Sequence, residues 1–298
     1  MAGGALIECI PNFSEGRDAG VVNAIEQAIA STPGVLLLRS EMDPDHNRSV
    51  ITFAGPPEAT AEGAFRGIRE AMERIDLRQH AGVHPRMGAA DVVPFVPLRE
   101  ATMEQCAAIA REVGRKVWEQ LGLPVYFYEA AASSPERRPL ENVRRGGFEK
   151  PASLPDLGGP ALHPTAGAAI LGARRLLIAY NINLSTTDLS IAQEIARRIR
   201  ASSGGLDAVK AMGVALPSRG CVQVSMNLID FERTGIDRVL NAVRDLAREA
   251  NVAVAGTQIV GLVPRKAIEE AASRDPEWLS FDANLILENR ILAAEAIE

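Results

Sequence analysis

The stretch Arg175–Arg197, "RLLIAYNINLSTTDLSIAQEIAR", contains two kinds of hydrophobic periodicity. In its first part the side chains alternate, with Tyr180 and Ile182 on one side and Asn181 and Asn183 on the other, which is typical of a strand. In its second part the apolar residues recur at helical spacing, at Leu189, Ala192, Ile195 and Ala196, and Ile199 continues the spacing just after it. The stretch therefore predicts a strand that runs into an amphipathic helix.

The segments on both sides extend this pattern. "VKAMGVAL" and "CVQVSMNLIDF" read as strands, residues 236–250 as a helix and "VAVAGTQIVGLV" as a last strand. The N-terminal half shows the same β-α-β-β-α-β order, followed by a helix over residues 103–120 and the strand "PVYFYEA". Its strand "DVVPFVPL" has two prolines, which predict an edge strand or an irregular one.

Two such units predict an α+β fold of two ferredoxin-like lobes, whose open sheet faces form a ligand groove between them. A doubly wound parallel sheet is the alternative. Residues 133–165 are rich in proline, glycine and charge, which indicates an ordered linker or lid. We expect an N-terminal domain with this linker over residues 1–165 and a C-terminal domain over residues 166–298.

Composition excludes several classes of function. The chain has 298 residues and a net charge of −6, which disfavours nucleic-acid binding. Its three cysteines, Cys9, Cys106 and Cys221, are far apart and odd in number, so reduced thiols are expected. The N-terminus does not resemble a signal peptide, and no run approaches the ~18 apolar residues of a membrane span. We therefore expect a soluble cytoplasmic protein without membrane contact.

Neutral polar side chains follow one face of two C-terminal strands. Asn181 and Asn183 alternate with apolar residues in the first, and Gln223, Ser225 and Asn227 do so in the second. A solvated face is one interpretation, but such faces usually carry Lys, Glu and Arg. Amides without charge better suit a half-buried surface that hydrogen-bonds a ligand.

The stretch "DLRQHAGVHPRMGAADVVPF" contains the strongest catalytic candidate, His84. A loop histidine before a buried strand can take and give protons near pH 7. His80 lies four residues earlier, but Gly82 and Pro85 disfavour a helix there, so no metal pair is expected. The loop histidines at positions 46 and 163 are weaker candidates, and a surface position without a role is the alternative for each.

Several long blocks resemble the formiminotransferase domain family. They include "ECIPNFSEGRD", "HNRSVITFAGPPEA", "HPRMGAADVVPFVPL", "YNINLSTTDLSIAQEIAR", "VQVSMNLIDFERTG" and "GTQIVGLVPRKAI", and the resemblance extends from Ile7 to about Ala271. It implies transfer of a formimino group from N-formiminoglutamate to N5 of tetrahydrofolate, in histidine degradation and one-carbon metabolism. Tetrahydrofolate is then a co-substrate, formiminoglutamate or glutamate the other ligand, the protein a homodimer, and no metal is needed. Because the chain ends at Glu298, no cyclodeaminase domain is expected.

The resemblance also implies site residues. The catalytic histidine of the family corresponds to His84, and its catalytic aspartate corresponds to Glu41, with Asp43 and Asp45 as alternatives. Separately, we expect Arg48 and Arg86 to bind the carboxylates of the substrate. The polar strand faces add four further substrate-binding candidates, Asn181, Asn183, Gln223 and Asn227. Two folate-binding segments match Gly158, Gly159, Pro160, Ala161, Leu162, His163, Pro164, Thr165, Ala166 and Gly167, and Gly204, Gly205, Leu206, Asp207, Ala208, Val209, Lys210, Ala211, Met212 and Gly213. Ala166 stands where some relatives have an aromatic residue.

Two other functions are compatible with this sequence. The same site could use 5-formyltetrahydrofolate and pass its formyl group to glutamate. Alternatively, the protein could bind folate without catalysis, because Glu41 departs from the family's aspartate. An assay that offers both donors distinguishes these functions.

Overall fold

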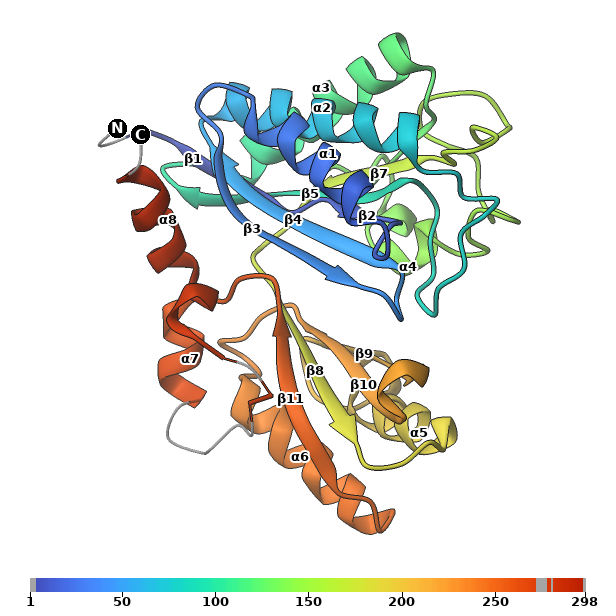
Figure 1. Cartoon of the computed structure of the whole chain (residues 1–298), viewed down its shortest axis with the longest axis vertical. Helices are drawn as coiled ribbons and strands as arrows, with labels where there is room; N and C mark the ends of the chain where they lie inside the picture. Colours follow the sequence, from blue (N-terminus) through green and yellow to red (C-terminus); the bar gives the residue numbers. More distant parts are fainter. Residues whose placement is uncertain (1–3, 272–277, 280, 297–298) are drawn as a thin grey trace. The chain divides into compact units, whose positions relative to one another are not determined.

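The structure, a computed structural model, describes residues 4–271, 278–279 and 281–296. The chain divides into two compact units, one up to Arg175 and the other from Leu176 to Ala296. Each unit has its own β-sheet with helices packed against it (Figure 1). The predicted mixed α+β class is confirmed. The doubly wound parallel sheet is wrong, because most strand pairings are antiparallel.

The N-terminal unit is built on one mixed sheet. Its strands are β1 (Leu6–Cys9), β2 (Asn12–Phe13), β3 (Leu36–Asp43), β4 (Arg48–Gly55), β5 (Ala90–Arg99), β6 (Val125–Glu129) and β7 (Ala169–Ala173). β1 and β2 follow each other between β4 and β5, β3 pairs with β4, and β7 lies parallel between β5 and β6. The expected edge position of "DVVPFVPL" is therefore wrong, because β5 has neighbours on both sides. Its expected irregularity is confirmed by two register shifts.

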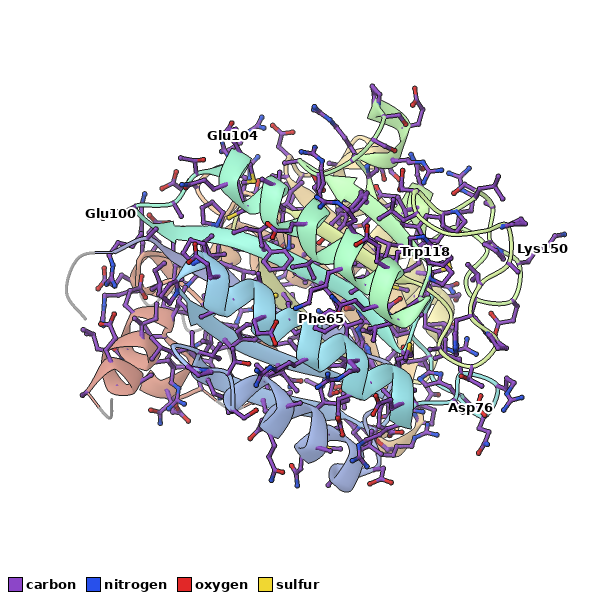
Figure 2. The ribbon with its side chains drawn as sticks, turned by 90° about the horizontal axis from the view of Figure 1, so that it is seen from above. Phe65, Asp76, Glu100, Glu104, Trp118 and Lys150 are labelled. Carbon is purple, nitrogen blue, oxygen red and sulfur yellow. The ribbon has the colours of Figure 1, made fainter. Side chains whose placement is uncertain are left out.

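Three helices cover one face of this sheet: α1 (Ala19–Ala30), α2 (Pro57–Arg74) and α3 (Met103–Leu121). Figure 2 looks onto them, with Phe65 on α2 and Trp118 on α3. α2 begins with Pro57 in its first turn, and α3 begins at a capping box between Thr102 and Gln105. Their apolar faces and the alternate residues of the strands form the main core of the unit.

A smaller core lies on the other face of the sheet. It contains Met87, Val92, Tyr126, Tyr128, Val143, Ala168 and Ile170. Val143 belongs to α4 (Leu140–Val143), which follows the 3₁₀ turn Pro135–Arg137 in the segment expected to be a linker. Residues 133–165, predicted as an ordered linker or lid, therefore contribute to the smaller core of this unit through Val143.

The C-terminal unit begins with the β-α-β-β-α-β order that the sequence predicts. Its first elements are β8 (Ile178–Leu184), α5 (Leu189–Ile199), β9 (Val209–Leu216), β10 (Cys221–Leu228), α6 (Ile236–Glu249) and β11 (Val254–Val260), with 3₁₀ turns at Ala201–Ser203 and Pro217–Arg219. The four strands are antiparallel in the order β11-β8-β10-β9. Further helical segments follow at α7 (Arg265–Ala271), the 3₁₀ turn Ala283–Leu285 and α8 (Leu287–Glu295). The apolar sides of β8 and β10 face α5 and α6 in one core.

The boundary between the two units lies later in the chain than the expected division after residue 165, because of β7. Residues 169–173 pair in parallel with both β5 and β6, so they belong to the N-terminal sheet. The compact units accordingly divide after Arg175.

Candidate active site

His84 lies in the loop between α2 and β5 and is partly buried. Its Nδ1 lies 2.7 Å from the carbonyl oxygen of Pro85. Because a carbonyl only accepts, Nδ1 carries the hydrogen and Nε2 keeps a free lone pair. The ring of His46, from the turn between β3 and β4, stacks on that of His84 with 5.9 Å between ring centroids. The backbone N–H of Val83 donates to the carbonyl of Asp45 at 3.3 Å, which joins the two loops beside the ring.

A buried carboxylate near His84 holds two arginines. Oδ2 of Asp91 accepts from Nη1 of Arg48 at 2.6 Å and from Nη2 of Arg144 at 2.8 Å. Oδ1 of Asp91 accepts from the backbone N–H of Met87 at 2.7 Å, and Nε of Arg48 donates to Oδ1 of Asn12 at 3.1 Å. The Asp91 side chain is fully buried, and those of Arg48 and Arg144 are 12% and 14% exposed.

The surrounding strands explain this geometry. Arg48 opens β4, Asn12 opens β2, and the two residues lie on neighbouring strands. A register shift between Asn12 and Phe13 makes room for Asp91 at the start of β5. Arg144 follows α4 and reaches the carboxylate from the segment that covers this face.

Charges in this cluster set the protonation of its members. Burial raises the pKa of Asp91, but the guanidinium groups of Arg144 and Arg48 outweigh it and lower this pKa to about 2. The pKa of His84 lies well below its ordinary 6.5, because of burial and the charges of Arg48 and Arg144. Asp91 acts in the opposite direction on that pKa. At neutral pH His84 is thus a neutral imidazole that can accept a proton.

The other residues expected near His84 have different environments. Nη2 of Arg86 donates to the carbonyl of Leu77 at 3.1 Å and to Oε1 of Glu149 at 2.8 Å. Glu41, on β3, pairs with Arg39 at 2.6 Å. Oδ1 of Asp43 accepts the backbone N–H groups of Asp45 and His46 at 3.0 and 2.9 Å, which shapes the turn that carries His46.

His80 does not form a metal pair with His84. Its Nε2 lies 2.8 Å from the carbonyl oxygen of Asn47. Within residues 4–271, 278–279 and 281–296, no three His, Cys, Asp or Glu side chains are grouped as a metal ion requires. That the protein works without a metal stays a prediction.

The first expected folate segment, Gly158–Gly167, lies against the histidine loop. The N–H of Ala89 donates to the carbonyl of Ala166 at 2.9 Å, and Gly88 and Gly167 form a β-bridge. A Cβ on Gly88 would overlap the carbonyl oxygen of Ala168, so only glycine allows this approach. Ala166 is fully buried in the main core.

The remaining predicted residues belong to the C-terminal unit. Asn183 faces Gln223 across β8 and β10, and Nε2 of Gln223 donates to Oδ1 of Asn183 at 2.9 Å. Asn181 is buried like these two, whereas Asn227 is exposed. A solvated face therefore does not describe Asn181, Asn183 and Gln223. In the second folate segment, Gly204–Gly213, a Cβ on Gly213 would overlap the backbone of α5.

Three residues of the cluster were not predicted as site residues: Asn12, Asp91 and Arg144. Asp91 has a signal, because it is the one charged residue in the otherwise apolar stretch "MGAADVVPFVPL". A buried strand seldom carries a lone carboxylate unless it has partners. Asn12 and Arg144 have no comparable signal, since one follows a proline in an apparent turn and the other lies among charged residues of an apparent linker.

No helix in the described part of the chain is long and apolar enough to cross a membrane.

Two family models match the sequence: the formiminotransferase domain, N-terminal subdomain, over residues 6–174, and the formiminotransferase domain over residues 179–293.

Curated relatives agree with these matches. The glutamate formimidoyltransferase of Thermoplasma acidophilum is 45% identical over 99% of this chain and 100% of its own length, and that of Streptococcus pyogenes is 42% identical over 96% and 99%. The formimidoyltransferase-cyclodeaminase of Rattus norvegicus is 44% identical over 90% of this chain, which spans 52% of that protein. The chain belongs to the formiminotransferase domain family.

Proposed function

We propose that this protein is a glutamate formimidoyltransferase, which transfers the formimino group of N-formiminoglutamate to N5 of tetrahydrofolate. Full-length relatives with this name are 42–45% identical to the chain. The observation that best supports the proposal is the geometry around His84, whose Nδ1 lies 2.7 Å from the carbonyl oxygen of Pro85. A neutral imidazole with a free Nε2, next to two arginines, suits proton transfer on an anionic substrate.

In this reaction N5 of the reduced pteridine attacks the amidine carbon and forms a tetrahedral intermediate. Nε2 of His84 takes the proton that N5 loses. The imidazolium then gives a proton to the departing nitrogen, and glutamate leaves as the C–N bond breaks. One group can perform both steps because the imidazole returns to its neutral form in each cycle. Such acid–base catalysis typically contributes about 10²–10⁴-fold.

A carboxylate that assists His84 belongs to the proposal, and the resemblance to the family implies this role for Glu41. Arg39 contacts Glu41, and Asp43 holds the turn with His46 and Asp45. The charge of Asp91, on β5, raises the pKa of His84, so Asp91 is a second carboxylate that can assist this histidine.

Tetrahydrofolate binding by the two glycine-containing segments is proposed from the resemblance. The packing of Gly158–Gly167 on the histidine loop supports it for the first segment. The ferredoxin-like character of the lobes, the groove between their sheet faces, the buried amides as substrate ligands, the homodimer and the cytoplasmic location belong to the same proposal. The strand order β11-β8-β10-β9 supports the ferredoxin-like character of the C-terminal lobe.

A direct assay tests the reaction. Purified protein is given tetrahydrofolate with N-formiminoglutamate, or glutamate with 5-formyltetrahydrofolate, and both products are followed separately. We expect 5-formiminotetrahydrofolate and glutamate from the first pair, and little turnover of the second. Preferred formyl transfer, or folate binding without turnover, would contradict the proposal.

A further inference from the structure

The cluster around Asp91 contains more positive than negative charge. Arg48 and Arg144 both donate to the same oxygen, Oδ2 of Asp91. Two guanidinium groups and one carboxylate leave an excess of one positive charge in a largely buried place. Such an excess is unfavourable unless an anion compensates it. The 12% and 14% exposure of the two arginine side chains leaves them within reach of a ligand.

Arg144 has unused capacity for hydrogen bonds. Its Nη2 contacts Asp91, and its Nε is buried without a hydrogen-bond partner among the described residues. An arginine fork can hold a carboxylate through two parallel N–H donors. The Nε of Arg86 is buried without a partner as well, so it is the exposed part of the Arg144 guanidinium group, and not its Nε, that a ligand oxygen can reach.

We propose that Arg144, together with Arg48 and held by Asp91, binds one carboxylate of the amino-acid donor beside His84. The inference rests on the proposed function and assigns a specificity residue to it. A dicarboxylate such as N-formiminoglutamate or glutamate is the chemical class that this pair of arginines recognises. Asp91 is a positioning residue, because it fixes both guanidinium groups without touching the substrate.

Arg86, the other arginine expected to hold a carboxylate, is less suited to this role. Its Nη2 is occupied by the carbonyl of Leu77 and by Glu149, and its guanidinium carbon lies 5.8 Å from the ring centre of Phe148. These contacts hold the histidine loop against the segment that carries Arg144, so Arg86 has a structural task.

Binding of a carboxylate here would also change His84. The groups that face its ring are Arg48, Arg144 and Asp91 by charge, His46 by stacking and the carbonyl of Pro85 by a hydrogen bond. A substrate carboxylate would neutralise the excess positive charge, so the pKa of His84 should rise when the donor binds. The histidine would then hold the proton from N5 more readily while the substrate is present.

Arg144→Gln in the full chain tests the inference, with Arg145→Gln as the matched control. Arg145 is the exposed neighbour of Arg144 and contacts Oδ1 of Asn142. For Arg144→Gln we expect glutamate affinity, measured by calorimetry, and KM for N-formiminoglutamate to worsen at least about tenfold. KM for tetrahydrofolate should change less than about threefold, and Arg145→Gln should leave all three values near wild type. Arg144→Lys, which keeps the charge without the fork, should retain part of the affinity.

NMR titration of the histidine rings, with His84 assigned through His84→Gln, gives a readout that does not depend on activity. Glutamate should raise the pKa of His84 in the wild-type protein. In ligand-free Arg144→Gln that pKa should already be higher than in wild type, and glutamate should no longer move it. Unchanged glutamate affinity in folded Arg144→Gln overturns the inference, as does an equal loss for both substrates. If Arg144→Gln does not fold, wild-type glutamate affinity in Arg144→Lys overturns it.

These measurements separate the inference from the proposed function. If the wild-type protein transfers no formimino group, the proposed function fails. The arginine site is still supported in that case if glutamate binds to the wild-type protein and raises the pKa of His84, and if Arg144→Gln weakens this binding. If transfer occurs and Arg144→Gln keeps its donor KM, the inference alone fails.

Discussion

The pKa of His84 is lowered because its ring is buried and because two guanidinium groups outnumber the one carboxylate near it. The hydrogen bond from Nδ1 to Pro85 orients the ring and leaves Nε2 available. The sequence indicates that His84 lies in a loop before a strand. It does not indicate which charges the fold brings beside it, because Arg48, Asp91 and Arg144 come from three separate segments.

Replacing His84 by alanine should lower turnover at least about 100-fold, because the acid–base group is lost. The side chain is partly exposed and outside both main cores, so the thermal unfolding temperature should change little. Single-turnover kinetics, with tetrahydrofolate affinity and thermal unfolding as controls, check this. Turnover within threefold of wild type would exclude His84 as the acid–base residue.

Asp91 should make the protein less stable in acid. Its pKa is about 2 in the folded protein and 3.8 ordinarily, so folding favours the charged form. This contribution, about 2 kcal/mol by linkage, is fully present above about pH 4 and disappears as pH falls through 2. Asp91→Asn should remove that pH dependence and lower stability at pH 7 by about 3–5 kcal/mol, since it leaves two buried cations without their partner.

Urea unfolding between pH 2 and pH 7 measures this effect. Asp245→Asn, which removes an exposed partner of Arg248, serves as the control and should follow the wild-type curve. Parallel curves for wild type and Asp91→Asn would contradict the prediction.

Glu8 should have the opposite effect. It is 2% exposed, its Oε2 has no hydrogen-bond partner among the described residues, and burial raises its pKa to about 7 against the opposing charge of Arg174. A raised pKa favours the folded state below the ordinary value of 4.5, and this contribution is lost as pH rises through 7. Glu8→Gln should therefore be more stable than wild type at pH 8, by about 2–3 kcal/mol.

Thermal unfolding of Glu8→Gln and wild type at pH 5 and pH 8 checks this, with the exposed Glu119→Gln as the control. The stability difference should grow with pH for Glu8→Gln alone. A wild-type protein that remains the more stable one at pH 8 would show that Glu8 is charged and compensated.

At the scale of elements, the loop that carries His84 and the segment Gly158–Gly167 are joined by backbone contacts. Ala89 bonds to Ala166, Ala168 bonds to Met87, and Gly88 and Gly167 face each other. Glycine-rich composition in both stretches indicates close backbone approach in each. It does not indicate that each stretch is the other's partner, because they lie far apart in the sequence.

Gly88→Ala should separate these two segments. Its Cβ would overlap the backbone of Ala168, so we expect a loss of at least about 1–3 kcal/mol in stability and a clear loss of tetrahydrofolate affinity. Gly159→Ala is the matched control for stability, because a Cβ there meets nothing within 4 Å. Chemical denaturation of both variants tests the difference, and equal stability would contradict it.

The position of β5 in the sheet cannot be predicted from its own residues. Its prolines predict an edge or irregular strand, and the strand has register shifts but lies inside the sheet. The missing N–H groups of Pro94 and Pro97 are a local property. The neighbours of β5 are not, because β7 pairs with it from beyond a long intervening segment. The helix α2 is a contrast, because it follows from the spacing of its own apolar residues and from Pro57 in its first turn.

On the scale of the whole chain, each unit has its own core, and β7 decides where the first unit ends. A fragment of residues 1–175 should fold by itself, since it contains the complete N-terminal sheet. A fragment of residues 1–165 lacks β7 and should not fold, because β5 and β6 would lose their shared neighbour. Near-ultraviolet circular dichroism and two-dimensional NMR of both fragments check this. Equal folding of the two would show that β7 is dispensable.

By itself, the sequence determined the order of strands and helices and the alternation of polar and apolar strand faces, and it singled out His84 as the catalytic candidate, because periodicity and loop chemistry are local. Only the tertiary structure decided that β7 joins the first sheet, that Arg86 contacts Leu77 and Glu149, and that Asp91 gathers Arg48 and Arg144 near the histidine. The physical reason is that strand partners and charge clusters depend on distances between segments that are remote along the chain.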